Sequence, residues 1–307
     1  MEEKEWTPGQ AFRFCRQMVS ARQRGLFNDS FFFPVFPRPG LLPGALRPHY
    51  DSIRAFSIVA EDFTDDPQYL ENLRPVFLEN WESQLLQCTW RKPNNPVFVA
   101  LKETIEAFNL PVSLFQDILT ARKLDLVNRR FSSFDDLLVY TRFSSRPFGR
   151  LGLLLLGKDD PELERLSDLL STGIQLACFW KNIGEDLRAG RVTLPADLMK
   201  QFHCSEKDFG EKGTITGFGP LVQELVLRTR EFFIQARPLP HRLAGRLRFE
   251  VSRVILSGER ILDRIDSRRE DRLHKRLNLG RADDLLISLR ALTGPRPRQS
   301  PEGGAGP

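Results

Sequence analysis

Helical periodicity dominates this sequence. Apolar residues recur at spacings of three and four along most of the chain, and capping residues and prolines mark where the runs begin. Thr7-Pro8 precedes the first run, and Asp160-Pro161 precedes the longest one, which ends at Gly190. Proline is favoured in the first turn of a helix, and glycine just beyond the last turn. Sustained strand alternation is absent from the sequence, so the pattern predicts an all-α protein.

The same pattern sets the expected domain organisation. No linker rich in proline, glycine or serine interrupts it before residue 295, so we expect a single domain. We assign residues 1–29 to an N-terminal helix and lead-in, 30–294 to the helical domain, and 295–307 to a disordered tail. Helices are expected from residue 8, over about 43–66, 68–90 and 96–108, from 111, from 134 through 140, and over about 161–189, 220–236, 240–267 and 281–293, with irregular segments at 31–43 and 205–220.

The charge pattern argues against a nucleic-acid partner. The formal net charge is +5, but the basic residues alternate with acidic ones, as in Arg260, Asp263 and Arg264. Such mixed runs are typical of solvated helix faces and not of a continuous basic surface.

The cysteines and the N-terminus indicate a cytoplasmic protein. The acidic, polar N-terminus is unlike a secretory signal, and the apolar run 151–156 is too short to span a bilayer. Contact with the inner face of a membrane is left open. The cysteines show no metal-binding spacing and are expected to be reduced: Cys15, Cys88, Cys178 and Cys204.

Two expected helix ends carry paired oxygen donors. Glu61 and Asp65 are four residues apart and share a helix face, as do Asn182 and Asp186. Each pair alone is explained more simply by solvated acids or by ion pairs with nearby lysine or arginine. If the two faces met, their oxygens would suit Mg²⁺, which binds carboxylates together with substrate phosphates.

The residues around both pairs resemble the squalene/phytoene synthase family, and the likeness covers about residues 30–294. The region from 124 to 157 also resembles the bacterial hydroxysqualene synthase branch, which acts in hopanoid biosynthesis. The matching words are Leu46-Arg47-Pro48-His49, Ala55-Phe56, Glu61-Asp62 and Asp65; then Tyr140 and Pro147-Phe148-Gly149-Arg150-Leu151; then Gln175-Leu176-Ala177, Asp186, Gly190-Arg191-Val192 and Leu194-Pro195.

The resemblance implies a helical bundle of the isoprenoid-synthase type around a central apolar cavity, with magnesium-bound diphosphate at the mouth of that cavity. It implies that magnesium is held by Glu61, Asp62, Asp65, Asn182 and Asp186. It places Tyr140 near the reacting carbons, with Asp65 and Asp186 as the other catalytic residues. Diphosphate is expected to contact Arg54, Gln175 and Arg191.

Several positions depart from the family pattern. Glu61 and Asn182 stand where the family has aspartates, and Ile58 stands where it has an arginine that holds diphosphate. Arg54 replaces a tyrosine one turn before Ile58. Because the two positions share a helix face, we expect the Arg54 guanidinium to reach the same phosphate.

The expected reaction is the conversion of presqualene diphosphate to hydroxysqualene. Two alternatives stay open: head-to-head condensation of two farnesyl diphosphates, and a non-catalytic relative that acts as a lipid-binding or assembly module. The sequence has no nicotinamide-binding glycine motif after a predicted strand, so a reductive step is not expected. Other enzymes of hopanoid synthesis are the expected protein partners.

Overall fold

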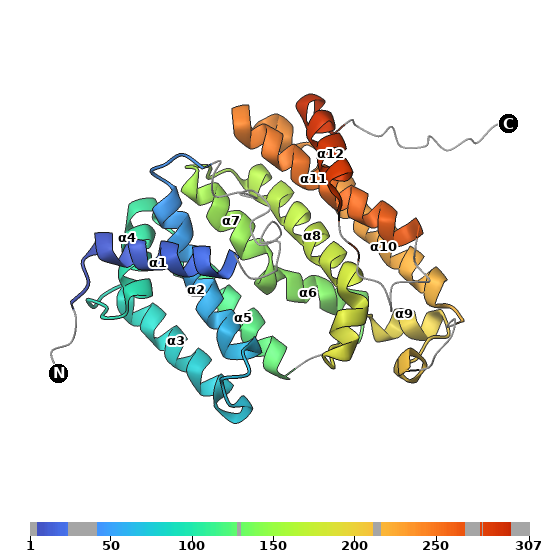
Figure 1. Ribbon diagram of the computed structural model, residues 1–307, viewed down its shortest axis with the longest axis horizontal. Helices are drawn as coiled ribbons and strands as arrows, with labels where there is room; N and C mark the ends of the chain where they lie inside the picture. The colour runs from blue at the N-terminus through green and yellow to red at the C-terminus, as the bar shows by residue number, and fades with distance from the viewer. Residues whose placement is uncertain are drawn as a thin grey trace.

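The computed structural model describes residues 5–23, 42–127, 130–210, 216–267, 277 and 279–295. Within these ranges the regular structure is helical, apart from one isolated β-bridge between Arg130 and Val192, so the all-α prediction is confirmed (Figure 1). The α-helices are α1 (Pro8–Gln23), α2 (Arg47–Asp65), α3 (Arg74–Cys88), α4 (Pro96–Phe108), α5 (Val112–Val127), α6 (Phe134–Ser144), α7 (Arg146–Leu155), α8 (Pro161–Arg188), α9 (Ala196–Gln201), α10 (Phe218–Ala236), α11 (Gly245–Ser267) and α12 (Arg281–Thr293). Short 3-10 helices are η3 (Glu71–Leu73), η4 (Glu206–Gly210) and η5 (Leu239–Arg242).

Side-chain caps explain where several helices begin. The Asn95 side chain accepts a hydrogen bond from the Val97 amide at 2.9 Å. Ser133 forms a reciprocal capping box with Asp136. Asp160 accepts from the amides of Glu162 and Leu163 at 2.8 and 3.0 Å. These bonds satisfy amides that have no partner within the helix, which is why these starts could be predicted.

Other boundaries differ from the expectations. The second helix begins at Arg47 instead of residue 43, and helix α11 begins at Gly245, after η5. Helix α7 was not predicted as a separate helix. It starts anew after Ser145, whose backbone is not helical, and Pro147 fits in its first turn because the amides there need no partner within the helix. Helix α9 and the short η4 were also not predicted. Most of the expected irregular segment 31–43 and nearly all of the expected tail 295–307 lie outside the described residues.

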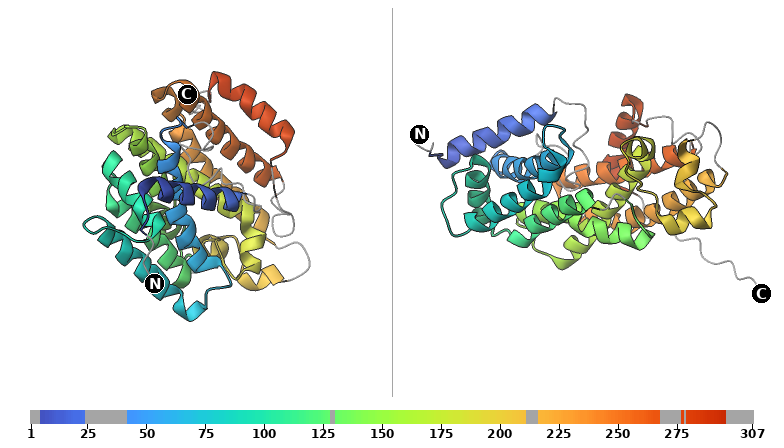
Figure 2. Two further views of the ribbon diagram at one scale, coloured as in Figure 1. Left: turned by 60° about the vertical axis from the view of Figure 1, so that its left-hand side comes forward. Right: turned by 90° about the horizontal axis from the view of Figure 1, so that it is seen from below.

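Two central helices organise the bundle. Helix α2 packs against α1, α3, α4 and α5, and helix α8 packs against α6, α7, α10 and α11. Helices α5, α6 and α7 lie between these two groups, and Figure 2 shows the same arrangement from two other sides. A single apolar core runs through helices α1 to α11. None of the described helices has the length and apolarity needed to cross a bilayer.

The core fixes both central helices firmly. Around α2, the fully buried Phe56 contacts the rings of Trp81, Phe98 and Phe115 at centroid distances of 5.5 to 6.1 Å. In α8, the buried Trp180 donates a hydrogen bond of 2.7 Å from its indole nitrogen to Thr229 of α10. Close packing of this kind leaves little freedom for the two helix ends that carry the acidic residues.

Candidate active site

Helix α2 is buried around most of its circumference and yet carries polar residues inside. Glu61 is only 8% exposed, and its carboxylate accepts a hydrogen bond of 3.3 Å from the Ser57 hydroxyl, one turn earlier. Asp65, one turn later, is exposed at the end of the helix. Charged residues are rarely buried without a specific reason. The end of α2 is therefore a candidate for chemistry and not only for packing.

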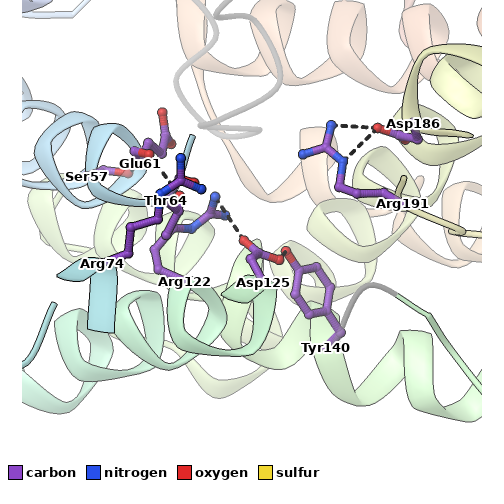
Figure 3. A network of polar contacts seen from close by, with 9 residues as sticks. All are labelled: Ser57, Glu61, Thr64, Arg74, Arg122, Asp125, Tyr140, Asp186 and Arg191. Atoms are coloured by element: carbon purple, nitrogen blue, oxygen red, sulfur yellow. Dashed lines mark hydrogen bonds and ion pairs between the residues drawn. The ribbon is translucent and has the colours of Figure 1, made fainter. Parts of the chain in front are cut away.

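Arg74 secures this end of α2. Its guanidinium donates hydrogen bonds to the backbone carbonyls of Thr64, at 2.6 Å, and Asp66, at 3.5 Å, and its Nε donates to that of Tyr69, at 3.3 Å. The last carbonyls of a helix lack partners within the helix and carry partial negative charge. The buried Arg74 satisfies them and so fixes the end of the helix that carries Asp65. Figure 3 shows Arg74 beside Thr64.

The end of α8 explains why glycine and arginine follow the aspartate. Gly190 has a φ of 74°, and its amide donates to the Leu187 carbonyl while the Arg191 amide donates to the Asp186 carbonyl. This is a Schellman motif, in which a left-handed residue turns the chain back on the helix. The turn brings the Arg191 guanidinium to the Asp186 carboxylate, with Nη2 at 2.7 Å and Nε at 3.2 Å from Oδ1.

A third set of residues lies between these two helix ends. Arg122 of α5 forms an ion pair of 3.1 Å with Asp125, and Asp125 accepts a hydrogen bond of 2.7 Å from the Tyr140 hydroxyl of α6. The Tyr140 ring packs against Phe131 and Phe179. Burial, and then the negative charge of Asp125, raises the pKa of Tyr140 far above its usual value. Tyr140 therefore stays protonated and acts as a hydrogen-bond donor.

The raised pKa values of Arg122 and Arg191 indicate that the end of α2, the end of α8 and the Arg122–Asp125–Tyr140 set share one charged centre. Burial alone would lower the pKa of Arg122, but its acidic neighbours raise it overall: Asp125, Tyr140, Glu61 and Asp65. Burial also opposes the charge of Arg191, and its pKa is nevertheless raised by Asp186, Asp65 and Asp125. Asp65 and Asp125 act on both guanidinium groups. Figure 3 shows Arg122, Asp125 and Tyr140 between the end of α2 and the Asp186–Arg191 pair.

Arg122 and Asp125 were not identified from the sequence. The two residues lie three apart on α5 and so share a face of that helix. An arginine and an aspartate at this spacing usually form a surface ion pair, so the spacing alone carries little information. Their importance follows from the packing of α5 against α2 and α6, which the local pattern does not specify.

The remaining predicted residues lie at varied distances from this centre. Arg54 is 2% exposed on α2, and its charge is one of those that oppose the burial of Asp51. Asn182 is half-buried on α8, one turn before Asp186. Gln175 is also half-buried on α8 but lies about 16 Å along the helix axis from Asp186. The structure therefore brings Asn182, but not Gln175, to the charged end of α8.

The donors fit magnesium only in company with a diphosphate. In the described part of the chain, no three aspartate, glutamate, histidine or cysteine side chains gather closely enough to hold a metal ion. The expected ring of metal ligands is thus not preassembled, because guanidinium groups neutralise the carboxylates: Arg191 binds Asp186, and Arg122 lies near Glu61 and Asp65. The hard oxygens of α2 and α8 still face one centre, and Mg²⁺ commonly combines one or two carboxylates with substrate phosphates.

Replacing Gly190 by alanine is expected to change the turn at the end of α8 that positions Arg191 in the charged centre. An alanine Cβ would meet no atom within 4 Å, so the cost of about 1 to 2 kcal/mol arises from the positive φ alone. The strained turn should displace Arg191 and weaken the binding of magnesium pyrophosphate by about tenfold or more. Isothermal titration calorimetry measures the binding, and thermal unfolding measures the stability.

Gly157 offers a matched control for this substitution. It has a φ of 65°, it ends α7 in the same Schellman motif, and an added Cβ would also meet open space. Gly157→Ala should lower stability as much as Gly190→Ala and leave pyrophosphate binding unchanged. Equal binding by the two variants would show that the turn at Gly190 has only a structural role.

Comparisons with known proteins agree with this arrangement. The family model for squalene/phytoene synthases matches residues 39–283. The phytoene synthase of Arthrospira platensis is 24% identical over 283 residues, which is 88% of each chain, and the 15-cis-phytoene synthase of Synechococcus elongatus is 26% identical over 87% of each chain. The crystal structure of squalene synthase HpnC from Alicyclobacillus acidocaldarius is 29% identical, with a TM-score of 0.75 over 84% of this chain and 93% of HpnC. A dehydrosqualene synthase at 19% identity shares the fold, with a TM-score of 0.77. The chain has the all-α isoprenoid-synthase fold and belongs to the squalene/phytoene synthase family.

Proposed function

We propose that this chain is a magnesium-dependent enzyme that converts presqualene diphosphate to hydroxysqualene. The observation that carries this proposal is the convergence of oxygen donors from α2 and α8 with two guanidinium groups, Arg122 and Arg191. Such a centre suits a substrate that must lose diphosphate. The likeness to squalene synthase HpnC, at 29% identity over 93% of that chain, supports squalene-type chemistry.

The reaction first breaks the carbon–oxygen bond to diphosphate, then rearranges and opens the cyclopropane ring of the substrate through carbocations, and finally forms a new carbon–oxygen bond. Diphosphate leaves with the electron pair of the first bond, and a water oxygen then bonds to the resulting carbocation and releases a proton. Glu61, Asp65, Asn182 and Asp186, with Asp62 beside them, would hold Mg²⁺ together with the diphosphate. When bound, the metal neutralises the charge that develops on the leaving group.

The arginines supply fixed positive charge at the same centre. Arg191 is anchored by Asp186 and keeps 48% of its side chain exposed, so part of its guanidinium is free to meet a phosphate. Arg122 lies near Glu61 and Asp65 at the end of α2. It places a positive charge at the end of the helix in which Ile58, about two turns earlier, stands where the family usually has an arginine. Whether Arg54 also contacts the diphosphate remains a prediction.

Tyr140 would act on the hydrocarbon part of the substrate. Its ring contacts Phe131 and Phe179, while its hydroxyl is committed to Asp125. The electron-rich faces of these rings are suited to stabilise a carbocation. The central apolar cavity that would hold the prenyl chains, and any role of Gln175 along it, remain predictions.

Condensation of two farnesyl diphosphates is the second candidate. The cyanobacterial relatives named as phytoene synthases favour it, because they match the chain over 87 to 88% of both lengths. A non-catalytic role is the third candidate, motivated by Ile58 and Asn182. Physical association with other enzymes of hopanoid synthesis belongs to the first candidate and is likewise a proposal.

Product analysis in labelled water separates these candidates. The full chain is incubated with Mg²⁺ and either presqualene or farnesyl diphosphate in ¹⁸O-water, and products are identified by mass spectrometry. We expect presqualene diphosphate to give hydroxysqualene whose oxygen carries the label, with no nicotinamide cofactor added. A condensation product from farnesyl diphosphate, without hydroxysqualene from presqualene diphosphate, would favour the second candidate. Tight binding of both substrates without turnover would favour the third.

A further inference from the structure

The outward face of α12 carries four exposed leucines and no charged residue. Leu285, Leu286, Leu289 and Leu292 each expose between 52% and 71% of their surface. At 3.6 residues per turn, they fall with Ala282 and Thr293 within about one third of the helix circumference, and no charged residue lies among them. We name these six residues the leucine face.

The opposite face of α12 holds the helix on the protein. Asp283 is 2% exposed and pairs with Arg260 at 2.9 Å and Arg264 at 2.6 Å, both on α11. Asp284 of α12 pairs with Arg253, which is also on α11. The packing of α12 is mainly against α11, at the outside of the bundle (Figure 1). A helix that only needs to pack turns its leucines inward. Here ion pairs do much of the anchoring, and the leucines are left facing outward.

Arginines border the leucine face. Arg281 and Arg290 lie at its two edges around the helix, and Arg248 lies beside Gly294 at its C-terminal end. Arg246, two residues before Arg248 on α11, is also exposed. In the described structure none of these four side chains takes part in an ion pair. An apolar helix face bordered by basic side chains is typical of helices that lie in the surface of an anionic membrane.

We propose that α12 docks this protein onto an anionic lipid bilayer, with the leucine face in the acyl boundary and the bordering arginines at the phosphate groups. A second copy of the chain fits this face less well. A stable interface takes roughly 20 to 30 residues from each partner, and a twofold contact would bring the bordering arginines together. The proposal does not depend on the reaction proposed above.

Vesicle flotation tests the proposal. The full chain is mixed with phosphatidylcholine vesicles or with vesicles enriched in phosphatidylglycerol, and the bound fraction is measured. Wild-type protein should float with the anionic vesicles, and Leu285→Gln/Leu289→Gln should lower the partition coefficient by at least about tenfold. Arg281→Gln/Arg290→Gln should weaken binding to anionic vesicles and reduce its sensitivity to salt.

The matched control removes two leucines that are exposed elsewhere. Leu86 on α3 and Leu227 on α10 are 43% and 53% exposed. Leu86→Gln/Leu227→Gln should float like the wild type, and thermal unfolding checks that each variant is folded. Wild-type protein that stays with neither vesicle, or equal loss in the two double variants, would overturn the proposal. A lipid-free dimer that Leu285→Gln/Leu289→Gln dissociates would overturn it in favour of a second copy.

Discussion

Replacing Asp186 by asparagine is expected to lower kcat/KM by about 100- to 1000-fold, the usual cost of losing one group that stabilises developing charge. Asparagine keeps the shape of the side chain but removes its negative charge. The substitution would therefore remove a proposed magnesium ligand and the partner that positions Arg191. Steady-state kinetics with presqualene diphosphate, at several Mg²⁺ concentrations, measures the loss.

The same substitution should cost little stability. Burial raises the pKa of Asp186 above its usual value, and Arg191 opposes that effect only in part, so the native fold bears a cost for this charge. The ion pair itself contributes about 0 to 1 kcal/mol, because nearly half of the Arg191 side chain is exposed to water. Asp186→Asn is therefore expected to unfold near the wild-type temperature. Active sites often contain charged residues that are needed for activity but do not stabilise the fold.

Asp168 provides the matched control on the same helix. It forms a two-bond ion pair with Arg150 of α7, at 3.0 and 2.6 Å, and lies far from the charged centre along α8. Asp168→Asn should retain kcat/KM within about twofold and lose roughly 0.5 to 1.5 kcal/mol of stability. Similar losses of kcat/KM in Asp186→Asn and Asp168→Asn would show that loss of either carboxylate from α8 impairs the enzyme. That result would refute a specific role of Asp186.

Local signals in the sequence were sufficient for much of the fold. The starts of α4, α6 and α8 follow from Asn95, Ser133 and Asp160, because a capping side chain bonds to amides only two or three residues away. The turn at Gly190 was predicted because glycine tolerates the positive φ found just beyond a helix end. The pairing of Glu61 with Asp65 on one face likewise requires only the period of a helix.

Features that depend on packing could not be predicted in this way. Nothing near Arg122 in the sequence reveals that α5 places it beside Glu61 and Asp65. The near-complete burial of Arg54 depends on how neighbouring helices cover α2. The outward orientation of the leucines of α12 also depends on packing, because ion pairs hold the opposite face of that helix against α11. Tertiary structure decides such cases, and residue type alone does not.

Replacing Arg122 by methionine is expected to lower kcat/KM for presqualene diphosphate by about 100-fold or more. Methionine keeps most of the apolar length of arginine, so the main change is the loss of positive charge. Glu61, Asp65 and Asp125 would then face one another without that guanidinium. Leaving Asp125 with fewer partners should cost about 1 to 3 kcal/mol of stability, measured by denaturant unfolding.

Magnesium should restore part of the stability that Arg122→Met loses. Such an effect distinguishes a role at the charged centre from a general structural role. Without Arg122, the carboxylates are freer to bind a divalent cation, and a ligand that binds only the native state stabilises it. Excess MgCl₂ should therefore raise the unfolding midpoint of Arg122→Met more than that of the wild type. Arg237→Met is the control, because Arg237 is also 15% exposed and pairs with the Glu259 carboxylate at 2.7 Å. Equal magnesium responses in the two variants would contradict the placement of Arg122 among the metal-binding carboxylates.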